Sequence, residues 1–346
     1  MSGAVGGRAD GLAAVTVGID IGGTKTLAIG VDARGGVLGQ VRLPSGYGAQ
    51  NVIDAAIEAI ERLRDELPMR AIERVGIGIP GTVDHRTGEV QQALNLGLEH
   101  VGLGAAIRDR LGVPVHVEND VNAAALGAVA ASGAGVGAID GAGAATGGES
   151  LAYLNLGTGL ATGLVLDGRL WRGVRGAAGE IGHVPLDPDG PACVCGQRGC
   201  IEVMASGSGI ARQWGPGVPP AAELGALALA GDPRAREIRD RLVWAVASAV
   251  RLIVLAQDVE RIVIGGGLAE ALDDTLIVPV VRMLRDWEAQ SAFFASLSPA
   301  ERVALVPADA PLAAIGAALA ARTERGARGD DADRSESTSE GSALHG

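Results

Sequence analysis

Residues 20–32 read DIGGTKTLAIGVD and residues 155–167 read NLGTGLATGLVLD, so that one segment can be laid on the other without a gap. Each combines an apolar strand, a polar residue, a turn rich in Gly and Thr, and a second apolar strand that ends in Asp. Apolar runs on either side of a short glycine turn predict a β-hairpin. A chain that uses this hairpin twice is expected to form two similar lobes, each presenting one Gly/Thr turn to a shared cleft.

Strands and helices alternate outward from the two hairpins, which predicts an α/β fold. We expect the hairpins over residues 14–31 and 152–166. Further strands are expected over residues 75–79, 113–117 and 261–264. Helices are expected over residues 51–67, 120–130 and 233–257, and residues 107–111 are expected to close a further helix that ends at Gly112.

The same pattern predicts the domain organisation. A first α/β lobe is expected over residues 14–122, completed by a helix over residues 312–322, and a second lobe over residues 123–311. Outside the lobes we expect a flexible start over residues 1–13, a flexible surface insertion in the Gly/Ala/Ser-rich residues 131–150, and a disordered charged tail over residues 323–346.

The composition limits the classes of partner. Hydrophobic residues make up 47% of the 346 residues and aromatic residues only 2%, so Ala, Val, Leu and Ile must fill the core. A formal charge of −12 argues against nucleic acid as a partner. No apolar run reaches the ~18 residues that a membrane span needs, and the start of the chain lacks the apolar segment of a secretory signal. We therefore expect a cytoplasmic protein with no membrane or nucleic-acid partner.

Three glycine turns follow apolar strands, at residues 22–25, 157–159 and 265–267. Glycine allows positive φ and close backbone approach, so successive N–H groups can point at an anion. One such turn alone is more often an ordinary tight turn, but three together, two of them related by the repeat, favour a nucleotide phosphate site. Residues 76–81 also match the dinucleotide pattern G-x-G-x-x-G, yet Pro80 interrupts it and no helix is expected to follow, so we reject a cofactor loop there.

All three cysteines lie close together, as Cys193, Cys195 and Cys200, and His183 precedes them. Zinc accepts three thiolates and one imidazole in a tetrahedron, and short Cys spacings let one loop supply most ligands. Three buried cysteines or a redox pair are the alternatives, but an odd, clustered set of thiols suits a metal better than disulfides. We expect a structural zinc site within residues 183–202, with all four protein positions filled.

An acidic group, Glu118-Asn119-Asp120, lies between an expected strand and an expected helix. Two interpretations remain open: Asp120 or Asn119 caps the helix, or Asp120 is a general base at the carboxyl end of a strand, where α/β sheets usually place ligands. Both can hold at once. Glu180 and Glu202 lie at the two ends of the expected zinc loop. Surface glutamates are usually only solvated, but a metal would fix these two for hydrogen bonds to sugar hydroxyls.

Seven motifs, in their order along the chain, resemble the ROK family (repressors, open reading frames, kinases) of bacterial sugar kinases. They are residues 19–25 (IDIGGTK), 78–81 (GIPG), 118–124 (ENDVNAA), 156–159 (LGTG), 180–183 (EIGH), 193–202 (CVCGQRGCIE) and 264–267 (IGGG). The resemblance covers about residues 15–321, and the cysteine loop is its most specific part. It implies a two-lobed actin/hexokinase-like (ribonuclease H-like) fold with a ligand cleft between the lobes.

The resemblance also implies a role for each matching residue. Asp120 would be the base that takes a proton from the sugar hydroxyl. The sugar would be held by Asn95, Asn119, Asp120, Glu180, His183 and Glu202, and His183 would also be a zinc ligand together with Cys193, Cys195 and Cys200. Phosphate and Mg²⁺ would lie near Asp20, Thr24 and Lys25. ATP would be cradled by Gly22, Gly23, Gly157, Thr158, Gly159, Gly265, Gly266 and Gly267.

The activity that the resemblance implies is ATP-dependent phosphorylation of a hexose by a homodimer or homotetramer that carries one structural Zn²⁺. Glucose is the expected substrate. N-acetylglucosamine, N-acetylmannosamine and fructose are alternatives, and polyphosphate is an alternative donor. The family's repressors carry a DNA-binding module ahead of the first strand, for which we expect no room here. A non-catalytic sugar-sensing regulator is a further alternative, against which Asp120 and the phosphate turns argue.

Three segments depart from the family pattern. Residues 96–100 lack the Pro-Gly-Trp often found after Asn95, which puts the sugar specificity in question. The insertion at residues 131–150 is longer than the family leads us to expect, and Val203-Met204 stands where Ala-Tyr is common. None of these segments includes the expected base or the zinc ligands.

Overall fold

The computed structural model describes residues 13–134, 149–307 and 310–323. The chain divides into two compact units. Of the described residues, unit 1 holds 13–123 and 313–323, and unit 2 holds 124–134, 149–307 and 310–312. The segments that we expect to be flexible or disordered lie mostly outside the described residues.

Unit 1 is built on a five-stranded sheet with the order β3-β2-β1-β4-β8. The first three strands along the chain are antiparallel neighbours: β1 (Ala13–Ile21), β2 (Lys25–Val31) and β3 (Val37–Pro44). The sheet continues in parallel with β1 through β4 (Arg70–Ile79) and β8 (Val115–Asn119). A small antiparallel sheet follows β4 along the chain and contains β5 (Thr82–Asp84), β6 (Glu89–Ala93) and β7 (Leu98–Val101).

The helices of unit 1 cover both faces of its large sheet. They are α1 (Ala49–Glu66), α2 (Leu103–Leu111), the short turn η1 (Leu94–Leu96) and a C-terminal helix over residues 312–323. One face packs against α1 through four alternate side chains of β1: Val15, Val17, Ile19 and Ile21. On the other face a β-carbon at Gly18 would collide with the carbonyl oxygen of Ala314, and one at Gly76 with that of Ala317. The backbone of the C-terminal helix therefore lies directly on β1 and β4.

Helix α3 (Asp120–Val129) begins in unit 1 and continues into unit 2, where it ends in a π-helical turn, η2 (Ala130–Ala134). The sheet of unit 2 has the order β11-β10-β9-β12-β13. Antiparallel neighbours are β9 (Leu151–Leu156), β10 (Leu160–Leu166) and β11 (Arg169–Leu170). Two strands run parallel to β9, namely β12 (Arg261–Gly265) and β13 (Val303–Leu305).

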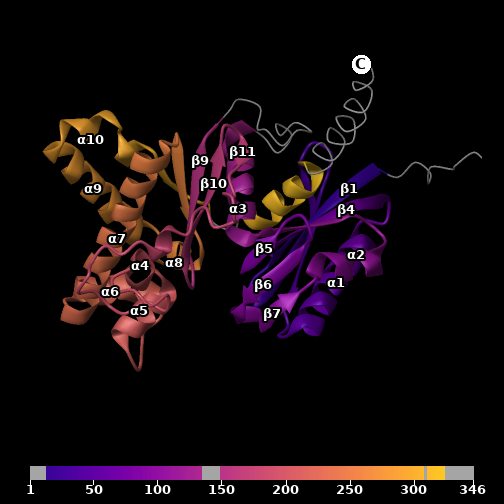
Figure 1. Cartoon of the computed structure of the whole chain (residues 1–346), viewed down its shortest axis with the longest axis horizontal. Coiled ribbons are helices and arrows are strands. Elements are labelled where there is room, and N and C mark those ends of the chain that lie inside the picture. The colour runs from indigo at the N-terminus through magenta and orange to yellow at the C-terminus, as the bar shows by residue number, and fades with distance from the viewer. Residues whose placement is uncertain (1–12, 135–148, 308–309, 324–346) are drawn as a thin grey trace, which may run out of the picture. The chain divides into compact units, whose positions relative to one another are not determined.

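The helices of unit 2 pack around the long helix α7 (Pro233–Gln257), which contacts α4, α6 and α9 (Figure 1). The others are α4 (Ile201–Ala205), α5 (Gly207–Trp214), α6 (Ala221–Ala230), α8 (Gly267–Leu272), α9 (Asp274–Gln290) and α10 (Ala292–Ser296), with short turns η4 (Ile181–His183) and η5 (Pro299–Glu301). Within the described part of the chain, no helix is both long enough and apolar enough to cross a membrane.

The two sheets repeat one topology, as the repeated hairpin predicts. In each, the first strand of the hairpin pairs in parallel with a later strand, which pairs in parallel with a further one. The alignment without a gap is wrong by one residue, however. Ile21 pairs with Thr26, whereas Leu156 pairs with Leu160, so the second turn is one residue shorter than the first.

The expected α/β fold is confirmed, and most expected elements are present. Helix α7 has the predicted bounds because Asp232 caps it by accepting the N–H of Ala235, and Pro233 fits its first turn. The strand expected over residues 113–117 instead starts at Val115, after Pro114, which has no N–H for a ladder. The helix expected to end at residue 130 continues to residue 134. The sequence pattern missed β3 and the small sheet, whose short strands alternate only weakly between buried and exposed.

Candidate active site and metal centre

Two acidic residues of unit 1 lie on strand ends that flank β4. Asp20 lies near the end of β1, and Asp120 directly follows β8. Gly78 of β4 pairs with Asp20 in the sheet, and a β-carbon at Gly78 would lie 3.6 Å from the Cα of Asp120. Glycine at this position therefore lets the two acidic residues approach each other across β4.

The surroundings of Asp20 favour its neutral form. Burial, and then the charge of Asp120, raise the pKa of Asp20 to about 7, although Lys25 acts in the opposite direction. A divalent cation bound at the two carboxylates would favour their charged forms and reverse this shift. Mg²⁺ is a hard cation that binds carboxylate oxygens and substrate phosphates, so the pair is chemically suited to hold it.

Helix α3 is capped within the acidic group. The side-chain oxygen of Asn119 accepts the N–H groups of Val121 and Asn122, at 3.0 and 3.2 Å, and its Nδ2 donates to the carbonyl oxygen of Gly81 at 3.2 Å. Oδ1 of Asp120 also accepts the N–H of Val121, at 2.9 Å. Asn119 therefore does most of the capping, and a base role for Asp120 is compatible with this arrangement.

Glu118 belongs to the acidic group seen in the sequence, but the sequence analysis gives it no role. It is 2% exposed, and its Oε1 accepts the N–H of Asn119 at 3.1 Å and Nδ2 of Asn122 at 3.2 Å. Its Oε2 lies 3.7 Å from Nε2 of the buried His116. Glu118 thus orients the segment that carries Asn119 and Asp120. Its position directly before Asn119 pointed to the site, but its burial cannot be seen in the sequence.

The first glycine turn and Asn95 lie together in unit 1. The N–H of Gly22 donates to the carbonyl oxygen of Lys25 at 3.0 Å and closes the turn, in which Gly23, Thr24 and Lys25 are exposed. A β-carbon at Gly23 would lie 3.4 Å from the Cβ of Asn95. A residue predicted to bind sugar is therefore next to a turn predicted to bind phosphate.

An aromatic side chain lies beside the segment that departs from the family pattern. Gly97 has a φ of 69°, and a β-carbon there would lie 2.7 Å from the ring of Tyr47. The N–H of Gly48 donates to the carbonyl oxygen of Leu96 at 2.8 Å and ties the two loops together. Tyr47 is 69% exposed. The chain thus presents an aromatic ring near Asn95 although its local sequence lacks the tryptophan of the family.

The two glycine turns of unit 2 lie side by side. The N–H of Gly157 donates to the carbonyl oxygen of Gly159 at 3.0 Å. Gly266 has a φ of 93°, and a β-carbon there would lie 2.6 Å from the carbonyl oxygen of Leu156. The start of α5 rests on the first turn, since the N–H of Gly207 donates to the carbonyl oxygen of Gly157 at 2.9 Å. Backbone turns gathered in this way suit an anion such as phosphate.

Asn155 lies between these two turns and is a second residue that was not selected from the sequence. Its Nδ2 lies 3.4 Å from the position of a β-carbon at Gly157, and its Oδ1 lies 2.6 Å from that of one at Gly266. The internal repeat could have identified Asn155, because Asn155 aligns with Asp20. Unit 2 thus has a neutral amide at the strand position where unit 1 has a carboxylate.

The acids at the ends of the cysteine loop lie close to the turn of residues 157–159. Oε2 of Glu202 accepts the N–H of Leu160 at 3.1 Å. A β-carbon at Gly182 would lie 3.4 Å from the Cβ of Glu202, so the turn η4 packs beside this glutamate. Glu180 directly precedes η4 and is exposed, whereas His183 ends it and is half-buried. The three residues predicted to bind sugar from unit 2 therefore share one small region.

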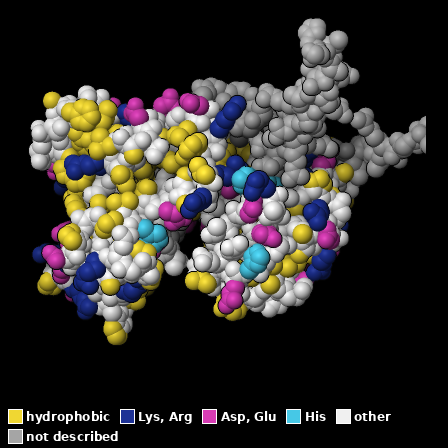
Figure 2. Space-filling view, in the orientation of Figure 1, with side chains coloured by type: hydrophobic (Ala, Val, Ile, Leu, Met, Phe, Trp, Pro, Cys, Tyr) yellow, Lys and Arg dark blue, Asp and Glu magenta, His cyan; other side chains and the backbone are white. Residues whose placement is uncertain are grey.

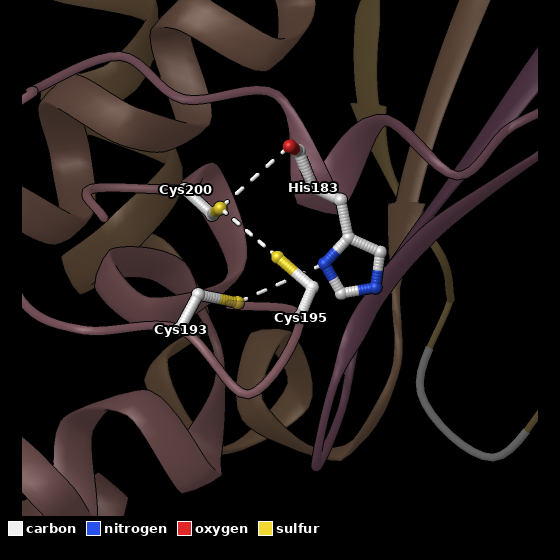
Figure 3. A group of neighbouring side chains, drawn as sticks. All are labelled: His183, Cys193, Cys195 and Cys200. Atoms are coloured by element: carbon white, nitrogen blue, oxygen red, sulfur yellow. Dashed lines mark hydrogen bonds between the residues drawn. The ribbon is translucent and has the colours of Figure 1, made fainter. Parts of the chain in front are cut away.

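His183, Cys193, Cys195 and Cys200 bring their ligand atoms to within 4.8 Å of one another (Figure 3). Nδ1 of His183 lies 3.8 Å from Sγ of Cys193, and Sγ of Cys195 lies 3.7 Å from Sγ of Cys200. A tetrahedron with Zn–S bonds of about 2.3 Å has S···S edges of about 3.8 Å. Donor set and spacing therefore both fit zinc, and the four ligands leave no open position.

The loop itself orders the thiols. The N–H of Cys193 donates to the carbonyl oxygen of Gln197 at 2.8 Å, and Nε2 of Gln197 donates to the carbonyl oxygen of His183 at 3.0 Å. Hydrogen bonds from the backbone and then the side chain of Gln197 lower the pKa of Cys195 to about 6, while burial raises that of Cys200 to about 12. A thiolate already favoured at Cys195 is a good first ligand for a metal ion.

The predicted site residues fall into two groups. Unit 1 gathers Asp20, residues 22–25, Asn95, Asn119 and Asp120. Unit 2 gathers residues 157–159 and 265–267, Glu180, Glu202 and the four metal ligands. Each group is compact within its own unit.

Comparisons with known proteins agree with the motifs. The model of the ROK family matches residues 16–323. The chain is 32% identical over 286 residues to a glucokinase of Halalkalibacterium halodurans, which covers 76% of this chain and 83% of that protein. It is 35% identical over 260 residues to an N-acetylmannosamine kinase of Citrobacter koseri, covering 74% and 84%. It is also 32% identical over 197 residues to the xylose repressor of Bacillus subtilis, covering 56% of this chain and 48% of the repressor.

Solved structures show the same fold. A ROK hexokinase from Thermus thermophilus has a TM-score of 0.72 at 34% identity and covers 90% of this chain and 99% of that one. A ROK family glucokinase from Streptomyces griseus, solved in complex with glucose and AMPPNP, has a TM-score of 0.68 at 30% identity and covers 89% and 99%. Both similarities extend over nearly the whole described chain, and they confirm the two-lobed actin/hexokinase-like fold.

Proposed function

The chain belongs to the ROK family, and from that premise we propose that it is an ATP-dependent sugar kinase whose substrate is a hexose, with glucose the favoured one. The observation that carries the proposal is the pair Asp20 and Asp120, which lie across Gly78 at the ends of strands in unit 1. Relatives described as glucokinases, and a structural neighbour solved with glucose and AMPPNP, support the choice of substrate.

In the proposed reaction Asp120 accepts the proton of the sugar hydroxyl that attacks the γ-phosphate of ATP. Asn119 caps α3, and buried Glu118 holds the backbone of the same segment, so the carboxylate of Asp120 is carried by a rigid element. Phosphoryl transfer has a loose transition state, so the protein contributes mainly positioning and charge stabilisation. Asp120 is therefore needed at the moment the hydroxyl loses its proton, more than for binding the sugar.

The sugar is held, in this proposal, by Asn95, Asn119, Glu180, His183 and Glu202. His183 would use Nδ1 for zinc and its other ring nitrogen for a sugar hydroxyl. Zinc would supply no chemistry beyond fixing the loop, because four protein ligands fill its coordination. We expect one zinc per chain by elemental analysis, and its loss in Cys195→Ser together with weaker sugar binding.

The nucleotide is assigned to residues 22–25, 157–159 and 265–267, with Asp20 and Lys25 near the phosphates. Mg²⁺, when bound with ATP, would neutralise phosphate charge. Backbone N–H groups of the glycine turns would hold phosphate oxygens, since no side chain blocks their approach. Thr24 and Lys25 are exposed and add a hydroxyl and a cation.

Release of ADP by the zinc-containing protein with Mg-ATP tests the proposal. The panel should contain glucose, fructose, N-acetylglucosamine and N-acetylmannosamine, with polyphosphate as an alternative donor. We expect turnover on glucose that falls at least 10³-fold in Asp120→Ala, an effect on the order of that of removing a catalytic base, with sugar binding nearly unchanged. Undiminished turnover in Asp120→Ala would refute the assigned base.

A kinase for N-acetylmannosamine is the second candidate, because the relative from Citrobacter koseri is of comparable similarity. Preferred turnover on an N-acetylhexosamine would replace glucose but keep the mechanism. A sugar-sensing regulator without catalysis is the candidate of another class, motivated by the similarity to the xylose repressor. Sugar binding without ADP release from any donor would favour it. A homodimer or homotetramer remains our expectation, which light scattering would check.

A further inference from the structure

A cavity of about 500 Å³ lies in unit 2 between α5, the first turns of α7 and the start of the cysteine loop. Its volume is in the range of small-molecule sites, about 300–1,000 Å³. None of its lining residues belongs to the glycine turns or is one of the acids assigned to the sugar. The proposed kinase reaction therefore leaves this cavity without a function.

Three arginines line the cavity, and helix geometry explains why they converge. Arg234 and Arg241 are seven residues apart on α7, so they lie on one face of the helix, with Glu237 between them. Arg212 comes from α5. A β-carbon at Gly209 would lie 2.5 Å from the carbonyl oxygen of Val203, so glycine there permits the close packing of α5 on α4 that shapes the wall.

Gln213 orders two of these arginines. Its carbonyl oxygen accepts Nη2 of Arg234 at 3.1 Å, and its Oε1 accepts Nη1 of Arg241 at 3.4 Å. Its own Nε2 donates to the carbonyl oxygen of Val203 at 2.9 Å, which anchors the side chain to α4. The guanidinium of Arg234 also lies 5.7 Å from the ring centre of Trp214. The arginines are thus held in place largely by neutral groups.

The cavity keeps a positive charge for the same reason. Nη2 of Arg212 donates to the hydroxyl of Ser208 at 3.3 Å, again a neutral partner. Glu237 is the one acid among the lining residues and pairs with Arg241 at 2.7 Å. Three guanidinium groups therefore face a single carboxylate in a chain whose formal charge is −12. The space-filling view shows arginine side chains at the lower left, in the region of α5 and α6, with some Asp and Glu side chains among them (Figure 2).

We propose that this cavity is a second ligand site, which binds a small phosphate monoester of about the size of a hexose phosphate. Arginine forks match phosphate oxygens in pairs and retain N–H donors beyond those used above. The lining also includes Pro191 and Ala192, which are not buried and offer a surface for the non-phosphate part. The cavity wall includes Ala192 and Val203, the chain neighbours of Cys193 and Glu202. A bound anion therefore contacts the segments that carry a metal ligand and a proposed sugar ligand, and it regulates hexose binding through them.

Equilibrium dialysis tests the site. It uses the full-length, zinc-containing Asp120→Ala variant, so that no sugar is phosphorylated during the measurement. The probes are inorganic phosphate and glucose 6-phosphate, with AMPPNP present to occupy the glycine turns. We expect glucose 6-phosphate to bind and its affinity to fall at least tenfold in Arg234→Gln/Arg241→Gln. The control Arg239→Gln/Arg285→Gln removes the same charge outside the cavity and should change the affinity less than twofold. Tryptophan fluorescence should report the same titration and lose its signal in Trp214→Phe, which keeps binding.

Absence of binding, equal weakening by both double variants, or complete displacement by AMPPNP would overturn the site. A second measurement, of the hexose KM, tests whether the bound anion regulates hexose binding. It rests on the proposed kinase function. Glucose 6-phosphate should change the hexose KM in the wild-type protein at least twofold and leave it unchanged in Arg234→Gln/Arg241→Gln. An equal response in both proteins would refute the regulatory part. Dialysis decides the site itself even if no sugar is turned over, so the two failures are distinguishable.

Discussion

Burial disfavours the charged form of Asp20, and the nearby Lys25 does not compensate for this effect. Its pKa is raised to about 7 by burial and by Asp120, whereas that of an aspartate in an unfolded chain is about 3.9. Between these values the folded state binds more protons than the unfolded state. The free energy of unfolding therefore falls as the pH rises from about 4 to about 7, and the loss is complete above the folded pKa. Asp20, which we propose to lie near Mg²⁺, thus destabilises the protein when no cation is bound.

We expect Asp20→Asn to be more stable than the wild-type protein at pH 8 in the absence of divalent ions. Each unit of pKa corresponds to about 1.4 kcal/mol, so a gain of about 1–3 kcal/mol is expected. Urea denaturation at pH 5 and pH 8 would measure it, and turnover should fall sharply in the same variant. Asp32→Asn is the control with the opposite sign, because the N–H of Gly36 holds the pKa of Asp32 below its usual value. A pH dependence of Asp20→Asn equal to that of the wild type would contradict the argument.

Asn155 occupies the position in unit 2 that aligns with Asp20 in unit 1, but its side chain is a neutral amide. We expect Asn155→Asp to raise the KM for ATP by about 10- to 100-fold. A carboxylate between two turns that we propose to bind phosphate costs about 1–3 kcal/mol at an effective dielectric constant near 20. The KM for the hexose should change little. Asn155→Ala separates repulsion from loss of the amide and should be the milder variant. Steady-state kinetics with ATP varied measures both, and equal effects would exclude a role for charge.

The elements of unit 1 pack at a distance that only glycine permits. The C-terminal helix lies on β1 and β4 at Gly18 and Gly76, where a β-carbon would collide with main-chain oxygens. Backbone atoms cannot rotate aside, so Gly18→Ala should cost about 1–3 kcal/mol, as overpacking usually does. Gly102→Ala is the matched control, because no atom lies within 4 Å of a β-carbon there. Thermal melting compares the two, and an unchanged midpoint for Gly18→Ala would show that the helix can move away.

Elements with a strong local signal could be predicted from the sequence, and contacts between elements could not. Helix α7 was predicted with its observed bounds because its cap, its first-turn proline and its apolar stripe are all local. The clustering of His183 with the three cysteines was predicted for the same reason, since one loop supplies all three thiols. The role of Glu118 was missed because it depends on the burial of this side chain beside His116. The arginines of the cavity were missed because α5 and α7 bring them together from positions 212 to 241.

At the scale of the whole chain, the two five-stranded sheets share one strand topology, and their hairpin turns differ in length. The repeat was visible in two 13-residue segments, although the turns differ by one residue, which only the strand registers reveal. The chain order also crosses the units, since residues 313–323 return to unit 1 after unit 2 is complete. Arg322 donates to the carbonyl oxygens of Asp32 and Ala33, at 3.3 and 2.7 Å, and ties the end of this helix to unit 1.

A truncation after Leu312 should therefore destabilise unit 1, although most of unit 1 lies at the other end of the sequence. Unit 1 would lose the helix that covers Gly18 and Gly76, whereas unit 2 would keep its sheet, α7 and the metal ligands. Hydrogen exchange should show loss of protection in β1 and β4 but not in β9 and β12, and zinc should remain at one per chain. A truncation after Thr323 keeps the helix and is the control. Equal loss of protection in both units would mean that they fold as one cooperative whole, and loss of zinc would mean that the cysteine loop depends on unit 1.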